Sequence, residues 1–183
     1  MSDIEKIMGK AIADISKVLG VDKANLARVQ GVDIPAAVGD RGVFGGGYIT
    51  SITDIIDAIM ISSTGNATDR DDLSVARRYL SATSNGTSDR GVFGGGLNSF
   101  GNEIDAITIS STGNAVDRDN LTAQRWSLAA TSNGTSDRGV FGGGWTSAVS
   151  DIIDYIVISS TGNAVDRDDL SVARYGLAGT SNA

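Results

Sequence analysis

Short apolar runs separated by polar turn residues follow one another along most of the chain, and each run has the length of a strand. Ile104–Ser110 (IDAITIS) is rich in β-branched residues and alternates, so Asp105, Ile107 and Ile109 are predicted to share one face of a strand. Arg90–Phe93 is a shorter apolar strand that leads into three consecutive glycines. The pattern predicts an all-β fold.

Turn residues mark the ends of these strands. Leu80–Ser84, another predicted strand, is followed by Asn85-Gly86, a pair that tolerates positive φ and favours a hairpin. Thr112-Gly113-Asn114 predicts a second turn. We interpret the Asp-rich stretch at 117–120 as a further, solvated turn with local Arg–Asp pairs. The triple glycine at 94–96 marks a point where the backbone needs unusual dihedrals or where another segment comes close.

Three blocks of sequence recur along the chain. The block DRGVFGGG occurs unchanged at 40–47, 89–96 and 137–144. The block ISSTGNATDRDDLSVAR occurs at 61–77, more loosely at 109–125, and with a single change at 158–174. The block TSNGTS occurs at 83–88 and 131–136, and it begins again at 180–182. The chain therefore holds three repeats with three or four strands each, near 40–88, 89–136 and 137–183.

Repeats of about 48 residues suit the blades of a β-propeller, and they also suit two self-closed pseudo-threefold folds, the β-trefoil and the β-prism. We predict a three-repeat β-domain over 34–183, joined to the preceding segment at the single proline, Pro35. Three blades cannot close a propeller, and open blades leave unpaired strand edges, so we expect a homo-oligomer. The predicted strand Leu177–Asn182 is not followed by another RGVFGGG block, and it is then expected to pair with residues 34–44 of the same or a neighbouring chain. A self-closed trefoil or prism would instead be a monomer.

The order of these motifs resembles that of kelch repeats, in which a di-glycine closes the second strand of a four-stranded blade. More narrowly, the unit RGVFGGG…ISSTGNA-x-D…L-x-x-x-R is similar to repeats of virion and tail-associated proteins of marine bacteriophages. The resemblance covers residues 34–183. Kelch propellers carry about four to eight blades and this chain holds three, so the resemblance implies that chains combine to close a ring, unless the three repeats close alone.

The first 33 residues carry a shorter repeat, of 11 residues, whose copies begin at Asp3, Asp14 and Asn25. Each copy predicts a short helix that ends at a glycine. Two-turn helices are not stable alone in water, so their apolar residues need a partner surface. We predict partner contacts for Ile4, Ile7, Ile15, Val18 and Leu26. The segment is similar to the N-termini of phage structural proteins, which implies an attachment role for residues 1–33.

Composition excludes several function classes. The chain has no cysteine and no histidine, which removes disulfides, thiol nucleophiles and the commonest catalytic base and metal ligand. The net charge is −7 and every lysine lies in the first 23 residues, so the acidic repeats argue against nucleic-acid binding. No apolar stretch is long enough to span a membrane. Met1–Lys6 lacks the features of a secretory signal, and we expect synthesis in a cytoplasm.

The Asp-rich stretches have the density of oxygen ligands that calcium prefers, but their spacing does not match an EF-hand loop. An arginine lies within each stretch and would repel a cation, so we expect no metal and no other cofactor. Three aspartates instead lie inside apolar strands. Because a buried charge needs a partner, we predict that Asp57, Asp105 and Asp154 each pair with a repeat arginine such as Arg77, Arg125 or Arg174, or cap backbone amides.

The loops after the triple glycines differ between the repeats, whereas the residues before them match. We predict that Tyr48, Phe100 and Trp145 in these loops bind a partner, either by stacking on a sugar or by anchoring a protein. The alternatives are an unconstrained surface and packing between repeats. Together these observations predict a non-enzymatic structural protein of a bacteriophage virion, as a decoration, appendage or tail-associated component. The alternative is a carbohydrate-binding or host-adhesion module that contacts a surface glycan.

Overall fold

The computed structural model of the chain describes residues 28–29, 32–33, 40–85, 89–98, 101–133 and 136–182. The chain divides into two compact units, Met1–Val38 and Gly39–Ala183. The described residues are all-β and contain no helix, and so none that could cross a membrane. The fold class predicted from the sequence is therefore confirmed at this level.

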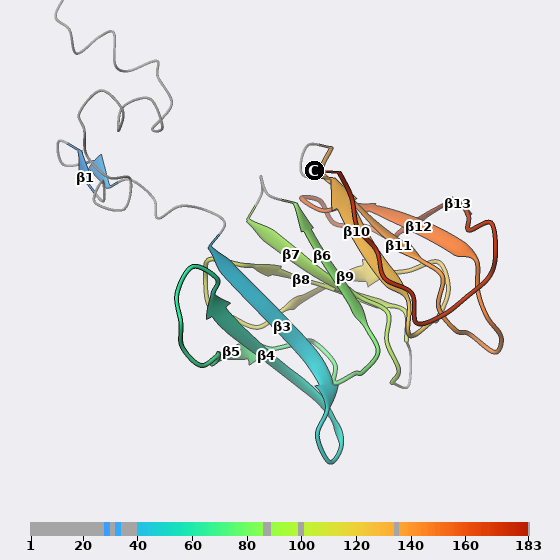
Figure 1. The fold of residues 1–183 in the computed structure, drawn as a ribbon, viewed down its shortest axis with the longest axis horizontal. Coiled ribbons are helices and arrows are strands. Elements are labelled where there is room, and N and C mark those ends of the chain that lie inside the picture. The colour runs from blue at the N-terminus through green and yellow to red at the C-terminus, as the bar shows by residue number, and fades with distance from the viewer. Residues whose placement is uncertain are drawn as a thin grey trace, which may run out of the picture. The chain divides into compact units, whose positions relative to one another are not determined.

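The larger unit contains three antiparallel sheets, each a meander in chain order (Figure 1). Sheet 1 consists of β3 (Arg41–Tyr48), β4 (Ile52–Met60) and β5 (Thr68–Asp72). Sheet 2 consists of β6 (Ser81–Asn85), β7 (Arg90–Gly94), β8 (Glu103–Thr108) and β9 (Val116–Asn120). Sheet 3 consists of β10 (Ala129–Asn133), β11 (Arg138–Gly142), β12 (Ile152–Val157) and β13 (Val165–Asp169). A β-trefoil requires a closed barrel, and the described strands form none.

Equivalent strands pair in the same register. Ser81 opposes Gly94 in sheet 2 as Ala129 opposes Gly142 in sheet 3. All three sheets also have a register shift just before the strand aspartate, for example between Ile104 and Asp105. Sheet 1 has three strands, because no strand equivalent to β6 or β10 pairs with β3 among the described residues.

The Asp-rich stretches are strands and not the solvated turns that we predicted, because they form β5, β9 and β13. Each is the edge strand of its sheet, where side chains can remain in water while the backbone pairs on one side only. Within β5 and β9 the central arginine, Arg70 or Arg118, is buried, whereas the aspartate before it is exposed and the aspartate after it is partly exposed. A polar sequence is therefore compatible with a strand at this position.

The hydrophobic core lies between successive sheets. Ile56 and Leu73 of repeat 1 pack with Phe93 and Ile107 of sheet 2. A second cluster joins sheet 2 to sheet 3 and includes Phe141, which is completely buried. Sheet 2 lies between the other two sheets (Figure 1), and both of its faces are therefore covered.

The triple glycines permit this close packing, as their sequence predicted. A Cβ atom on Gly94 would lie 2.7 Å from Cε1 of Phe141, which is closer than carbon atoms approach. Gly95 has φ of +67°, and a Cβ atom there would lie 2.7 Å from the carbonyl oxygen of Arg125. One glycine therefore admits a ring of the next sheet, and the following one takes a left-handed backbone conformation that side chains disfavour.

In the smaller unit β1 (Arg28–Val29) pairs antiparallel with β2 (Val32–Asp33). The third predicted helix covered residues 25–31, so that prediction is wrong at β1. The physical reason is that Val29 and Val32 are β-branched and oppose each other directly, which favours a strand pair over a two-turn helix. The other predicted helices, Pro35 and the contact residues Ile4, Ile7, Ile15, Val18 and Leu26 lie outside the described residues.

Candidate binding surfaces

Successive sheets are joined by a buried ion pair. Asp105 of β8 and Arg77, which follows sheet 1, have fully buried side chains with a distance of 3.0 Å between Nη2 and Oδ2. Ser74 completes the cluster, since its backbone N–H and its hydroxyl donate to the Asp105 carboxylate at 3.0 Å and 2.5 Å. The aspartate is thus held by three donors of the preceding repeat, and the predicted pairing is confirmed.

The same cluster joins sheets 2 and 3. Asp154 accepts from Arg125 Nη2 at 2.6 Å and from the backbone N–H and hydroxyl of Thr122 at 3.1 Å and 2.5 Å. Arg125 Nη1 also donates to the carbonyl oxygen of Ile152 at 2.5 Å. Burial lowers the pKa of Arg125, and attraction to Asp154 opposes that effect.

The third strand aspartate, Asp57, forms no such ion pair among the described residues. Arg174 is exposed, and its guanidinium donates to the carbonyl oxygen of Val172 at 3.0 Å. Asp57 lies in sheet 1 and has no arginine partner among the described residues. The reason is geometric: each arginine pairs with the aspartate of the next sheet, and within the described residues 40–182 no sheet precedes sheet 1 and none follows sheet 3.

In repeats 1 and 2, two further arginines bind the turn at the end of the next sheet's third strand. In sheet 1, Arg41 donates to the carbonyl oxygen of Ser110 at 3.0 Å, and Arg70 donates to that of Thr108 at 2.9 Å. Burial lowers the pKa of Arg70, and repulsion by Arg41 lowers it further. Sequence reasoning missed these two residues, although their repetition in all three repeats was the available signal.

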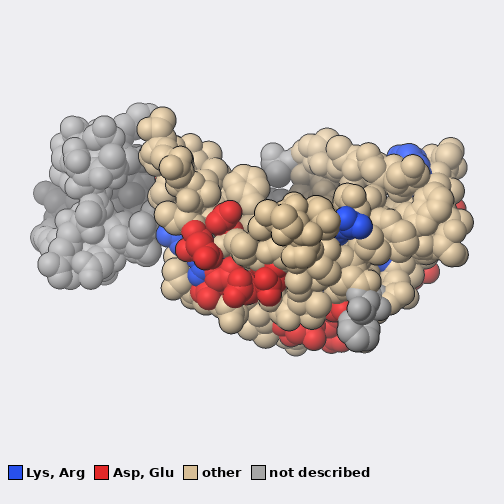
Figure 2. All heavy atoms as spheres, turned by 90° about the horizontal axis from the view of Figure 1, so that it is seen from below, with Lys and Arg blue, Asp and Glu red and all other residues tan. Residues whose placement is uncertain are grey.

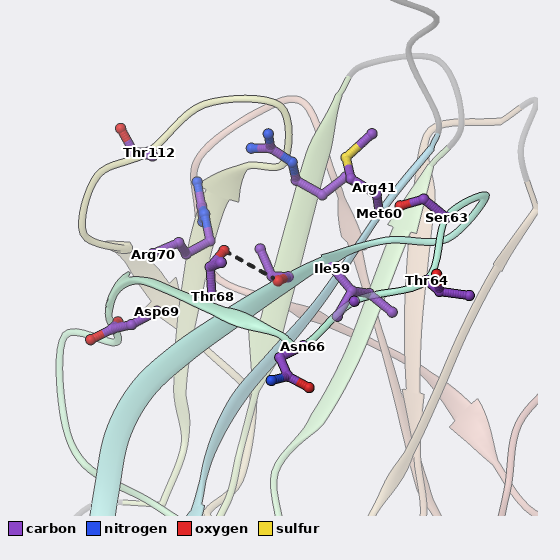
Figure 3. Close-up of a pocket in the computed structure, with 12 residues that line it drawn as sticks. Arg41, Ile59, Met60, Ser63, Thr64, Asn66, Thr68, Asp69, Arg70 and Thr112 are labelled. Carbon is purple, nitrogen blue, oxygen red and sulfur yellow. Dashed lines mark hydrogen bonds between the residues drawn. The ribbon is translucent and has the colours of Figure 1, made fainter.

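A pocket of about 230 Å³ lies beside Arg41 and Arg70 (Figure 3). Its other walls carry hydroxyl and amide groups, including those of Thr64, Asn66 and Thr112. Figure 3 shows the two guanidinium groups extending to the same side of the pocket. A second pocket, of about 310 Å³, occupies the equivalent place in sheet 2, so the repeat generates a polar pocket more than once.

The Asp-rich edge strands make the surface acidic. Figure 2 shows Asp and Glu side chains gathered in patches on one face, with few Lys or Arg side chains near them. Partial desolvation, together with repulsion by Asp54, Asp69 and Asp71, raises the pKa of Asp72. Across the described parts of the chain no group of three or more acidic side chains is arranged to hold a metal ion.

The loops after the triple glycines are placed at the ends of strands. Tyr48 is 60% exposed, and the guanidinium of Arg78 lies 5.0 Å from its ring centre. Trp145 is half-buried and packs edge-to-face on Tyr175, with the ring centres 5.3 Å apart. Phe100, the third predicted contact residue, lies outside the described residues. Tyr48 is thus available to a partner, while Trp145 also contributes to packing between segments of the chain.

Comparison with known protein families and with curated proteins found no match to this chain.

Proposed function

We propose that the chain is a non-enzymatic structural protein whose repeated sheets form a propeller-like scaffold for displaying loops. One observation carries the proposal: the strand carboxylates at both internal interfaces, Asp105 and Asp154, are buried and fully engaged by donors of the neighbouring repeat. Carboxylates held in this way join sheets and do not face a substrate. The loops after the triple glycines, by contrast, differ between repeats, which is typical of surfaces that bind a partner.

The resemblance of the repeats to virion and tail-associated proteins of marine bacteriophages supports a more specific role. We infer that the protein is a decoration, appendage or tail-associated component of a virion, with residues 1–33 docking it on other virion proteins. The absence of lysine from the repeats and their acidic surface support contacts with protein in place of nucleic acid.

Particle fractionation tests this role. Particles are purified from infected or induced cells by density gradient, and the chain is quantified by mass spectrometry against the other particle proteins. We expect a fixed copy number per particle, and a variant lacking residues 1–33 is expected to fold but to stay out of the particles. Recovery of the intact chain only in the particle-free fraction would contradict the proposal.

The repeated polar pockets favour carbohydrate binding as a second candidate, because weak sites that recur on one scaffold gain affinity through avidity. A glycan array probed with the chain tests this role. Thr64→Ala and Thr112→Ala remove exposed hydroxyls of the first pocket, and Tyr48→Ala removes the exposed aromatic ring of the first loop. Loss of glycan binding in the threonine variants alone would identify the pocket as the glycan site. Loss of binding in Tyr48→Ala alone would identify the loop as that site.

A further inference from the structure

The two outer faces of the three-sheet stack present the same residues as the internal interfaces, but no further sheet of the larger unit covers them among the described residues. Each sheet has an Arg face, toward the following sheet, and an Asp face, toward the preceding one. At each internal interface the Asp face contributes a phenylalanine and an aspartate, and the Arg face contributes arginines and the first glycine of the triplet. Sheet 3 exposes its Arg face, and sheet 1 exposes its Asp face.

The phenylalanines show the difference most clearly. Phe93 and Phe141, on the Asp faces of sheets 2 and 3, are 2% and 0% exposed, whereas Phe44 of sheet 1 is 62% exposed. The glycines are complementary to them. A Cβ atom on Gly94 would clash with Phe141, while at Gly142 the nearest atoms would lie 3.8 Å and 3.9 Å away and belong to sheet 3 and the residue after it. A space for one ring is thus open on the Arg face of sheet 3.

The charged groups follow the same rule. Arg70 and Arg118 are buried at the internal interfaces, and their equivalent Arg167 is exposed. Arg174 and Asp57 are the equivalents of the two pairs that are completely buried, and within the chain they have no charged partner in the described part. The two outer faces are therefore complementary in charge as well as in shape.

The backbone offers a third match. Among the described residues β3 pairs with β4 only, so the other edge of its first five residues has no neighbouring strand there. Leu177–Asn182 lies against β10 as β10 lies against β6: Ser181 donates to the carbonyl oxygen of Ser132, and Ser132 donates to that of Ser84. Residues 178–182 thus correspond to β6 and β10, the first strands of sheets 2 and 3, but no described strand pairs with them. Conversely, β3 corresponds to the second strands β7 and β11, and no described first strand pairs with it.

We propose that the Arg face of sheet 3 packs on the Asp face of sheet 1 of a second copy, and that two copies close a ring of six sheets. Residues 178–182 of one copy add to β3 of the other in the register of the β6–β7 pair, so Ala178 opposes Gly45 and Asn182 opposes Arg41. Arg174 pairs with Asp57 of the second copy. Such head-to-tail contacts form a closed ring when the rotation returns to its start, and six sheets fall within the range of known propellers. The inference is independent of the biological role proposed above.

Gly142→Ala tests the contact with little disturbance of the chain itself. Light scattering after size-exclusion chromatography is expected to give the wild-type chain the mass of two copies. The new methyl group has room in the single chain but occupies the place of Phe44 of the second copy. The variant is expected to keep the wild-type circular dichroism and to be a monomer at the same concentration. A monomeric wild type, an oligomer of another size, or a Gly142→Ala dimer would each overturn the proposal.

Exchange of the charges tests the pairing itself. Arg174→Asp and Asp57→Arg place like charges together in both contacts of a homodimer, so each is expected to weaken dimerisation at least about 100-fold. A mixture of the two variants forms one exchanged and one native pair, and it is expected to recover the dimer, as is the chain carrying both changes. Asp117→Arg, an exposed change of the same charge on β9, is the control and is expected to leave the dimer intact. Failure of the mixture to dimerise, with both variants folded, would refute the pairing of Arg174 with Asp57.

Discussion

Gly94→Ala is expected to destabilise the chain, whereas the same substitution at Gly142 is not. Both residues are the first glycine of a triplet, and neither has a positive φ. The added Cβ atom lies 2.7 Å and 2.8 Å from Cε1 and Cζ of Phe141 at the first position, and no atom lies within 3.8 Å at the second. Phe141 is completely buried, so its ring cannot move aside without displacing the core.

Overpacking of this kind costs about 1–3 kcal/mol. Both substitutions also reduce the freedom of the unfolded chain, which stabilises the fold by about 0.4–1 kcal/mol, and this effect cancels when the two variants are compared. We therefore expect Gly94→Ala to be less stable than Gly142→Ala by about 1–3 kcal/mol in urea unfolding. The difference corresponds to roughly 2–12 °C in melting temperature for a unit of this size.

The comparison is made in the Arg174→Asp background, so that every variant is expected to be a monomer and self-association does not contribute. Phe141→Leu should relieve part of the clash with Ala at position 94, and a double-mutant cycle is expected to show coupling of at least about 0.5 kcal/mol. Equal stability of Gly94→Ala and Gly142→Ala, within about 0.5 kcal/mol, would refute the assignment of Gly94 as the space for the ring.

Four further outcomes are expected. Asp154→Ala leaves the Arg125 charge buried without a carboxylate and should cost about 3–5 kcal/mol in urea unfolding, against at most about 0.5 kcal/mol for the exposed Asp117→Ala. Desolvation and neighbouring carboxylates raise the pKa of Asp72, so the folded state binds this proton more tightly than the unfolded state does. This carboxyl should therefore add stability as the pH falls through its raised pKa toward its ordinary value of 3.8, and Asp72→Asn should flatten that part of the curve of melting temperature against pH. A chelator should leave the melting temperature unchanged. Deletion of residues 1–33 should leave the strand signal in circular dichroism intact, and its loss would contradict an independent β-domain.

The strands and the buried ion pairs could be predicted from the sequence for a physical reason. Asp105 and its equivalents follow an isoleucine inside an apolar strand in every repeat, and burial of an unpaired carboxylate is too costly to recur. The only cations in the repeats are arginines at fixed spacing, so the candidates for pairing with Asp105 were few, and Arg77 was among them. A single strand does not show which residue pairs with its aspartate, but the recurrence of aspartate and arginine in every repeat made the ion pair predictable.

Other features could not be read from the sequence. The register of the repeat was ambiguous, because a periodic sequence does not reveal whether a sheet begins at Ser81 or at Arg90; only pairing between β6 and β7 settles it. The Asp-rich stretches were misinterpreted because polarity indicates exposure and does not distinguish a turn from an edge strand. In the smaller unit, local hairpin pairing of Val29 with Val32 replaced a helical pattern of only a few residues.

The positions at which the repeats differ in sequence favour an assembly in which both outer faces are covered. The loops after the triple glycines have diverged at nearly every position, so the repeats have had the opportunity to change. Phe44 and Asp57 nevertheless retain the residue types that are buried at the internal interfaces, as do Gly142 and Arg174 on the opposite face. An exposed phenylalanine and an unpaired strand aspartate contribute nothing to a single chain, and a glycine there only increases the entropy of the unfolded state. Their retention is explained if both faces are covered in the assembled protein, and complementarity between the two faces makes a second copy the partner that fits them.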